Sequence, residues 1–165
     1  MLDKVPARGT NRLTSLVKAP KRYLLDPALA TAAAGLTAHD ILTAGLTGRF
    51  FDAFGTAQLR PETALIHTRP TLHHLRETHG RQEVDLVIDM GAGRVVDLKF
   101  KAGATPDSSD ARHLRWLRDR LGEDFLAGAV MHSGSGLYEL GVRIFAVPSV
   151  RSGGEHLRAE PACAA

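Results

Sequence analysis

The chain has 165 residues, and its 21 basic and 18 acidic side chains give a formal net charge of +3. This length suits one domain, and 44% hydrophobic with 24% charged residues excludes a disordered chain. No apolar run reaches the roughly 18 residues of a membrane helix, and the N-terminus lacks the apolar core of a signal peptide. The single cysteine, Cys163, excludes a disulfide framework. We therefore expect a cytoplasmic protein without a membrane partner.

The first 46 residues predict an accessory segment made of a hairpin and short helices. Short apolar stretches at 13–17 and 23–25 flank a Pro-containing basic turn, which is typical of two paired strands. An alanine-rich stretch over 28–34 and the stretch over 37–46 predict two short helices.

From residue 47 the pattern is that of an α/β core with a mixed sheet. An antiparallel hairpin comes first and a crossover helix later, so the order is helix, three strands, helix, one or two strands. Pro61 is expected to end the first helix because proline breaks the helical hydrogen bonds. The polar residues 151–165 predict a flexible tail. The predicted elements of the core domain, 47–150, are a helix over 47–59, strands over 71–76, 83–89 and 94–101, a helix over 110–121, and strands over 125–132 and 142–147.

An aspartate and a lysine stand two residues apart on the second strand of this hairpin, at Asp97 and Lys99. Strand alternation places both on one face of an apolar strand, where burial of charge is costly unless the groups pair or hold an ion. Asp85 lies on the preceding strand. A register that sets Asp85 opposite Asp97 brings both carboxylates to one face, and a one-residue slip separates them.

Two carboxylates and a lysine are the groups that metal-assisted phosphodiester hydrolysis needs. Carboxylate oxygens hold Mg²⁺, the metal activates water, and an ammonium group stabilises the charge that develops on the phosphoryl group. A structural ion pair on a half-exposed sheet is the simpler alternative, because ion-pair networks imitate such sites.

The order of several short segments resembles a known family. Residues 18–26 (KAPKRYLLD) look like its KSPKxYFxD segment, and 48–54 (GRFFDAF) look like its GxLxExF helix. Arg76, the EVD run at 83–85 and the DLK run at 97–99 follow in the same order. The family is the C-terminal domain of prokaryotic AAA-type ATPases, domain of unknown function 4143. More broadly, the strand-turn-strand with these acids is similar to the PD-(D/E)xK restriction-endonuclease-like superfamily.

This resemblance implies a restriction-endonuclease-like core and assigns roles to four residues. Asp85 and Asp97 would be the Mg²⁺ ligands, Lys99 the catalytic lysine, and Asp52 an outer acidic residue carried by the first helix of the core. The family commonly has glutamate at the position of Asp52 and often at that of Asp97, so the reach of the shorter Asp52 side chain is reduced.

The sequence leaves two functions open. One is a Mg²⁺-dependent nuclease or DNA-binding domain, and the other is a catalytically silent module that binds a protein partner. The resembling proteins carry an N-terminal ATPase, but the phosphate-binding motif GxxxxGK[ST] is absent here, so we expect no ATP hydrolysis.

Overall fold

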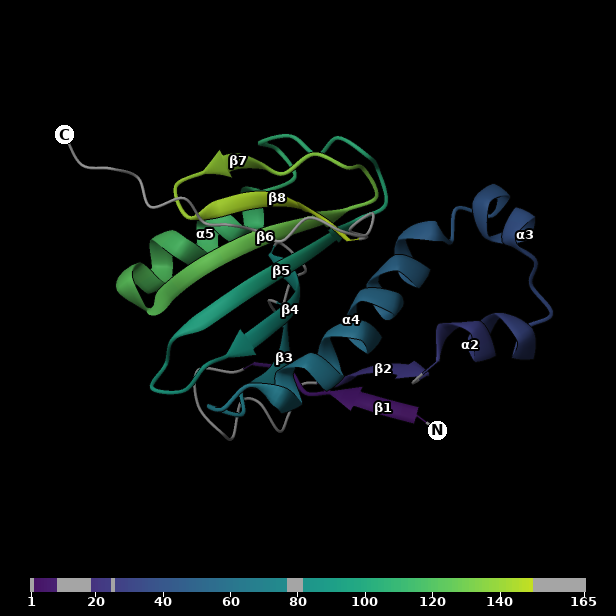
Figure 1. Ribbon diagram of the computed structural model, residues 1–165, viewed down its shortest axis with the longest axis horizontal. Helices are drawn as coiled ribbons and strands as arrows, with labels where there is room; N and C mark the ends of the chain where they lie inside the picture. The colour runs from purple at the N-terminus through teal and green to yellow at the C-terminus, as the bar shows by residue number, and fades with distance from the viewer. Residues whose placement is uncertain (1, 9–18, 25, 77–81, 150–165) are drawn as a thin grey trace.

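The computed structural model describes residues 2–8, 19–24, 26–76 and 82–149. Over these ranges the chain is an α/β protein with a mixed six-stranded sheet and four α-helices (Figure 1), which confirms the predicted α/β class. No helix in the described ranges combines the length and the apolar character needed to cross a bilayer. The predicted tail lies outside these ranges.

The strand order of the main sheet is β3-β4-β5-β6-β8-β7, and β1 and β2 form a separate two-stranded sheet. Strands β3, β4 and β5 are antiparallel neighbours, β5-β6 and β6-β8 are parallel pairs, and β7 is antiparallel to β8. The elements in chain order are β1 (Leu2–Val5), β2 (Lys21–Leu24), α2 (Pro27–Ala33), α3 (Ala38–Thr43), α4 (Thr47–Leu65), β3 (Thr71–Arg76), β4 (Glu83–Asp89), β5 (Val95–Lys101), α5 (Arg112–Leu121), a 3₁₀ turn (Gly122–Asp124), β6 (Phe125–His132), β7 (Tyr138–Gly141) and β8 (Ile144–Pro148).

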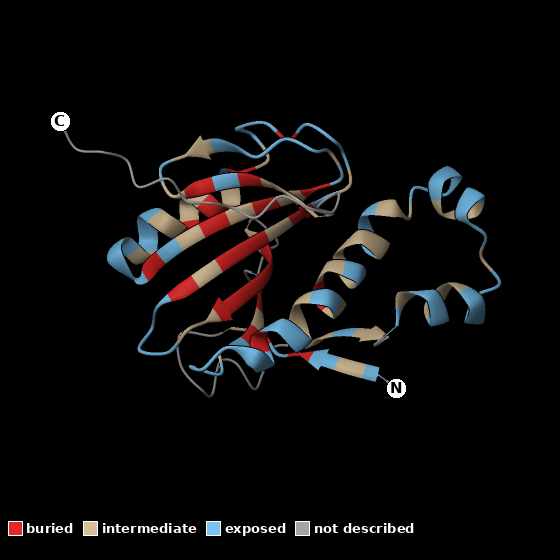
Figure 2. Cartoon of the chain, in the orientation of Figure 1, coloured by how far each residue is buried: buried red, intermediate tan, exposed pale blue. Residues whose placement is uncertain are grey.

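Buried residues concentrate in the strands of the main sheet (Figure 2), and apolar side chains pack on both of its faces. Helix α5 covers one face with Leu114 and Leu117, and Ala111, the residue that precedes the helix, is buried in the same cluster. Helix α4 packs on the other face, where the ring of Phe51 meets the buried ring of Phe100 edge to face at a centroid distance of 6.1 Å. The sheet is thus enclosed by a helix on each side, and its central strands are buried.

The accessory hairpin differs from the one predicted. Strand β2 forms where the stretch over 23–25 predicts a strand, but it pairs with β1, with Leu2 opposite Leu24 and Val5 opposite Lys21. The predicted partner stretch, 13–17, lies outside the described residues. Because Val5 is fully buried in the cluster on the α4 side of the main sheet, tertiary packing anchors β1 where local pattern gives little signal.

Pro61 does not end helix α4, which continues to Leu65. The prediction that it ends the helix is therefore wrong. Contacts on either side of the proline hold the last turn in place: the guanidinium of Arg60 pairs with Asp3 of β1, and Thr63 is buried with its hydroxyl donating to the carbonyl of Arg60. Tertiary contacts here outweigh the intrinsic cost of proline inside a helix.

Candidate functional site

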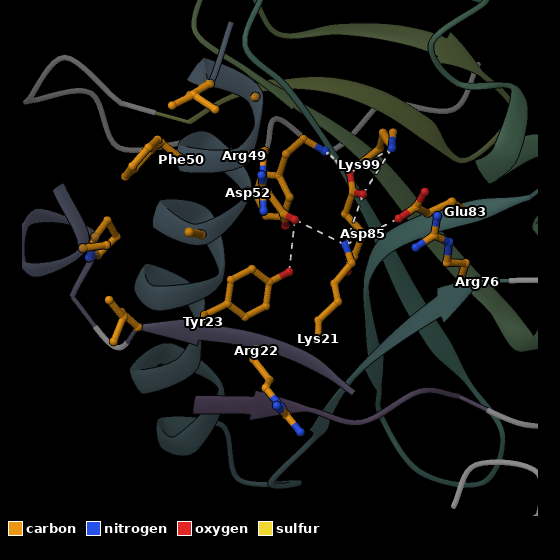
Figure 3. A pocket seen from close by; sticks show the side chains of 17 residues that line it. Lys21, Arg22, Tyr23, Arg49, Phe50, Asp52, Arg76, Glu83, Asp85 and Lys99 are labelled. Atoms are coloured by element: carbon orange, nitrogen blue, oxygen red, sulfur yellow. Dashed lines mark hydrogen bonds and ion pairs between the residues drawn. The ribbon is translucent and has the colours of Figure 1, made fainter. Parts of the chain in front are cut away.

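A cavity of about 770 Å³ opens where β2, α4 and the neighbouring ends of β4 and β5 meet (Figure 3). Five basic side chains line it together with three acidic ones. The basic residues are Lys21, Arg22, Arg49, Arg76 and Lys99, and the acidic residues are Asp52, Glu83 and Asp85.

Asp85 reaches this cavity because strand β4 is irregular at that position. His73 is paired with Val87, but Leu75 is paired with Val84, so Asp85 and Leu86 together oppose the single residue between His73 and Leu75. Such a β-bulge changes which face the following side chains occupy. Simple alternation predicts Val84 and Leu86 on one face, yet Val84 packs in the cluster beneath α5 and Leu86 packs in the cluster beneath α4.

The Asp85 carboxylate takes over part of the strand pairing at this point. The β4–β5 ladder ends at Leu86 opposite Leu98, although both strands continue past it. Oδ2 of Asp85 accepts the backbone N–H of Phe100 at 3.0 Å, in a region that is buried. This hydrogen bond fixes the carboxylate between the two separating strands, with its side chain only 10% exposed.

Two lysine ammonium groups contact the Asp85 carboxylate (Figure 3). Lys99 Nζ lies 3.0 Å from Oδ2 and 3.2 Å from Oδ1, and it comes from the neighbouring strand β5. Lys21 Nζ, from β2, lies 3.4 Å from Oδ1 and 3.4 Å from the Asp85 backbone carbonyl oxygen. Burial of a carboxylate is costly unless charged partners offset the lost solvation, and these two lysines supply that compensation.

Lys21 also joins Asp85 to Asp52 of helix α4. Its Nζ lies 3.3 Å from Oδ2 of Asp52, and the hydroxyl of Tyr23 donates to the same oxygen at 3.0 Å. Burial raises the pKa of Asp52, although Lys21 acts in the opposite direction. Burial by itself would lower the pKa of Lys21, but the carboxylates of Asp85 and Asp52 outweigh it and raise that pKa, which keeps the ammonium charged.

Asp97 does not join this cluster. It is paired with Val87 on one side and with Gly128 of β6 on the other, and a Cβ at Gly128 would touch Leu114 of α5. Asp97 therefore lies in the core beneath α5, fully buried, and neither carboxylate oxygen has a hydrogen-bond partner among the residues that the structure describes. Burial raises the pKa of Asp97 to about 7, against a smaller opposing effect of Arg8.

The structure thus brings together three of the four predicted site residues. Asp85, Lys99 and Asp52 line one cavity, whereas Asp97 is not part of its lining. The condition that Asp85 stand opposite Asp97 is not met, because Asp97 pairs with Val87 and the bulge displaces Asp85.

The residues of the cavity do not fit the Mg²⁺ site that the resemblance implies. The two expected ligands, Asp85 and Asp97, do not share a cavity, and the described ranges contain no group of three His, Cys, Asp or Glu side chains placed to hold a metal ion. The carboxylates that do converge, from Asp52, Glu83 and Asp85, converge on Lys21 Nζ at 3.3, 4.0 and 3.4 Å.

Four polar residues of the lining receive no individual role from the sequence: Lys21, Arg22, Tyr23 and Arg49. Lys21 and Tyr23 belong to the segment on which the family resemblance rests, so a signal was present, but a segment match assigns no contact. The Lys21–Asp85 contact spans 64 residues, which local periodicity does not register. Arg49 is exposed on the first turns of α4 and gives no pattern of its own.

Comparison with known proteins identifies one family. The profile of the family described as Domain of unknown function (DUF4143) matches residues 47–151, which is more than half of the chain. No curated protein and no solved structure gives a significant match. The matched residues contain α4, the main sheet and α5, whereas the hairpin that supplies Lys21 and Tyr23 precedes them. The chain belongs to the DUF4143 family.

Proposed function

We propose that this chain is a nucleic-acid-binding module of the restriction-endonuclease-like, PD-(D/E)xK type, which receives a backbone phosphate in the cavity beside Asp85. The observation that carries the proposal is the excess of basic side chains, five against three acidic ones, around one open cavity of about 770 Å³. Polyanion recognition depends on this kind of local charge, even where the net charge of the whole chain is small.

The acidic side chains of the cavity are already engaged within the protein. Asp85 is held by Lys99, Lys21 and a backbone N–H, and Asp52 is held by Lys21 and Tyr23. Their negative charge is therefore largely balanced before any ligand arrives.

The arginines at the rim are differently placed. Arg22 and Arg49 are exposed, and neither guanidinium group forms a hydrogen bond or ion pair with another described residue. Arginine offers a planar set of N–H donors that matches phosphate oxygens, so these two side chains are suited to contact a backbone phosphate. The Lys99 ammonium, whose side chain is 27% exposed, adds a third positive group that a ligand in the cavity can approach.

Hydrolysis by a Mg²⁺ ion on Asp85 and Asp97, with Lys99 as catalytic lysine and Asp52 as outer ligand, stays a prediction from the resemblance. The contact between Lys99 and Asp85 is compatible with it, and the burial of Asp97 in another part of the core argues against it. Phosphate binding needs only the groups that line the cavity, and for this reason we prefer it as the function. A cytoplasmic location and a link to an AAA-type ATPase likewise remain predictions.

Binding of a labelled single-stranded or duplex oligonucleotide, followed by fluorescence anisotropy over a series of salt concentrations, tests this proposal. Arg49→Ala should weaken binding and reduce the slope of log K against log salt by about one unit. Arg94→Ala is the matched control, because Arg94 is also an exposed arginine and lies in the turn at the far end of the β4–β5 hairpin. Equal losses in both variants, or no binding by the parent, would refute a phosphate site in this cavity.

A second candidate, a catalytically silent protein-interaction module left from an ATPase-linked protein, is favoured by a different feature. An apolar groove of about 320 Å³ lies between α2 and the first half of α4, with Phe50, Phe51 and Phe54 among its lining residues. Phe54 is 39% exposed, and Leu29 of the nearby α2 is 52% exposed. Exposed apolar surface of this kind is common at protein contacts. This candidate would be favoured if Phe54→Ser lost the binding of a protein partner that the parent chain binds, while its oligonucleotide binding stayed unchanged.

A further inference from the structure

Oxygen atoms of three acidic residues gather around the Lys21 ammonium group. Its Nζ lies 3.3 Å from Asp52 Oδ2, 3.4 Å from Asp85 Oδ1, 3.4 Å from the Asp85 carbonyl oxygen and 4.0 Å from Glu83 Oε1. Carboxylate and carbonyl oxygens are the donors that hard divalent cations prefer. These donors come from two separate elements, α4 and β4, so the cluster is assembled by the fold rather than by one loop.

From this arrangement we infer that the Lys21 ammonium takes the place of a divalent cation between Asp52 and Asp85, so that the cavity accepts an anionic ligand without a metal. The inference deepens the proposed function and rests on it for the identity of the ligand. It also gives a second reason, beside the burial of Asp97, why the residues do not fit Mg²⁺: a charged group of the chain itself lies between Asp52 and Asp85.

Electrostatics supports a permanent rather than a transient role for Lys21. The side chain is 20% exposed, and the carboxylates of Asp85 and Asp52 raise the pKa of the ammonium despite burial. Tyr23 lies two residues after Lys21 on β2. Its hydroxyl donates to the same Asp52 oxygen and holds that carboxylate toward Lys21. Without Lys21, the carboxylates of Asp52, Glu83 and Asp85 would face one another with Lys99 as the remaining ammonium at Asp85. An oxygen set with that charge attracts a divalent cation.

Lys21 also shows that the site extends beyond the family domain. The hairpin of β1 and β2 precedes the matched residues 47–151, yet β2 places Lys21 against Asp85 of the central sheet. The accessory segment thus supplies the positive charge that the acidic side chains of the family domain require.

Calorimetric titration of Mn²⁺ into the full chain tests the inference without any nucleic acid. We expect no saturable binding in the parent up to about 5 mM, and binding of one Mn²⁺ with a dissociation constant below about 1 mM in Lys21→Met. Adding Asp85→Asn to Lys21→Met should abolish the gained site. Lys4→Met is the matched control, because Lys4 is an exposed lysine on the partner strand of the same hairpin, and it should behave like the parent.

Saturable Mn²⁺ binding by the parent that Asp85→Asn removes would overturn the inference, and so would a folded Lys21→Met variant with no gain in affinity. A Lys21→Met chain that regains its circular dichroism spectrum only with Mn²⁺ supports it. Should that variant fail to fold under all conditions, the parent titration still decides. Oligonucleotide binding tests the proposed function on its own. If the chain binds no oligonucleotide, the result of the metal titrations still decides the role of Lys21.

Discussion

Replacing the buried aspartate of β5 by its neutral isostere, Asp97→Asn, should stabilise the protein at alkaline pH. Asp97 is fully buried and its two oxygens lack partners within the described part of the chain, so ionisation in the folded state is unfavourable. Burial raises its pKa from 3.8 to about 7. A difference of about three pKa units corresponds to a loss of about 4 kcal/mol of stability when the carboxylate is ionised.

The sign of the pH dependence follows from this raised pKa. The folded chain holds the proton on Asp97 more tightly than the unfolded chain does, so the parent loses stability as pH rises from about 4 to about 7 and no further above that. Asp97→Asn lacks this group. The stability difference between variant and parent should therefore be small near pH 4 and grow to about 2–4 kcal/mol near pH 8, where the buried amide still lacks a partner.

Urea unfolding of parent and variant across this pH range measures the effect. Asp119→Asn is the control, because the Asp119 side chain is 67% exposed and its ion pair with Arg118 should change stability by less than about 1 kcal/mol. A stability difference for Asp97→Asn that does not vary with pH, or a destabilised variant at pH 8, would refute the burial of an unpaired carboxylate at this position.

Two further predictions concern the packing of α4 and the hydrogen bond at Asp52. Gly55→Ala should destabilise the protein by about 1–3 kcal/mol in thermal unfolding, since the new Cβ would lie 2.0 Å from the Phe100 ring. Gly48→Ala is the control in the same helix: its new Cβ meets no atom within 4 Å, and it should stabilise the protein by about 0.5–1 kcal/mol. If both alanines stabilise, the close packing of α4 on β5 is wrong. Tyr23→Phe removes a donor to Asp52 and should cost about 1 kcal/mol in urea unfolding at neutral pH, and an unchanged midpoint would contradict that hydrogen bond.

The sequence predicts most of the main sheet because its strands carry strong local patterns. The strands over 71–76, 83–89 and 125–132 have the predicted bounds, and the alternation and turn residues around them suffice to place them. The length of α4 is underestimated, because its last turns are held by the ion pair between Arg60 and Asp3 of β1 and by the burial of Thr63, which local pattern does not register.

The candidate site is only partly predictable from the sequence, for a geometric reason. The two-residue alternation of side chains along β4 assumes regular strand pairing, and no glycine or proline in the strand marks the bulge. The bulge places Asp85 at the cavity, whereas Asp97, opposite Val87, lies in the core. Lys21 escapes detection because its role depends on a contact across 64 residues. Residue types and strand positions are therefore accessible from the sequence, whereas the register and the long-range partners of Asp85 are not.

Oligonucleotide binding by the parent chain in the presence of EDTA tests the central claim most directly. A basic cavity whose cation position is filled by Lys21 predicts binding that weakens with salt and does not require Mg²⁺, so that about 5 mM Mg²⁺ in place of the chelator should weaken it, as a competing counterion does, and not strengthen it. Binding that appears only with Mg²⁺, or no binding under either condition, would contradict the claim.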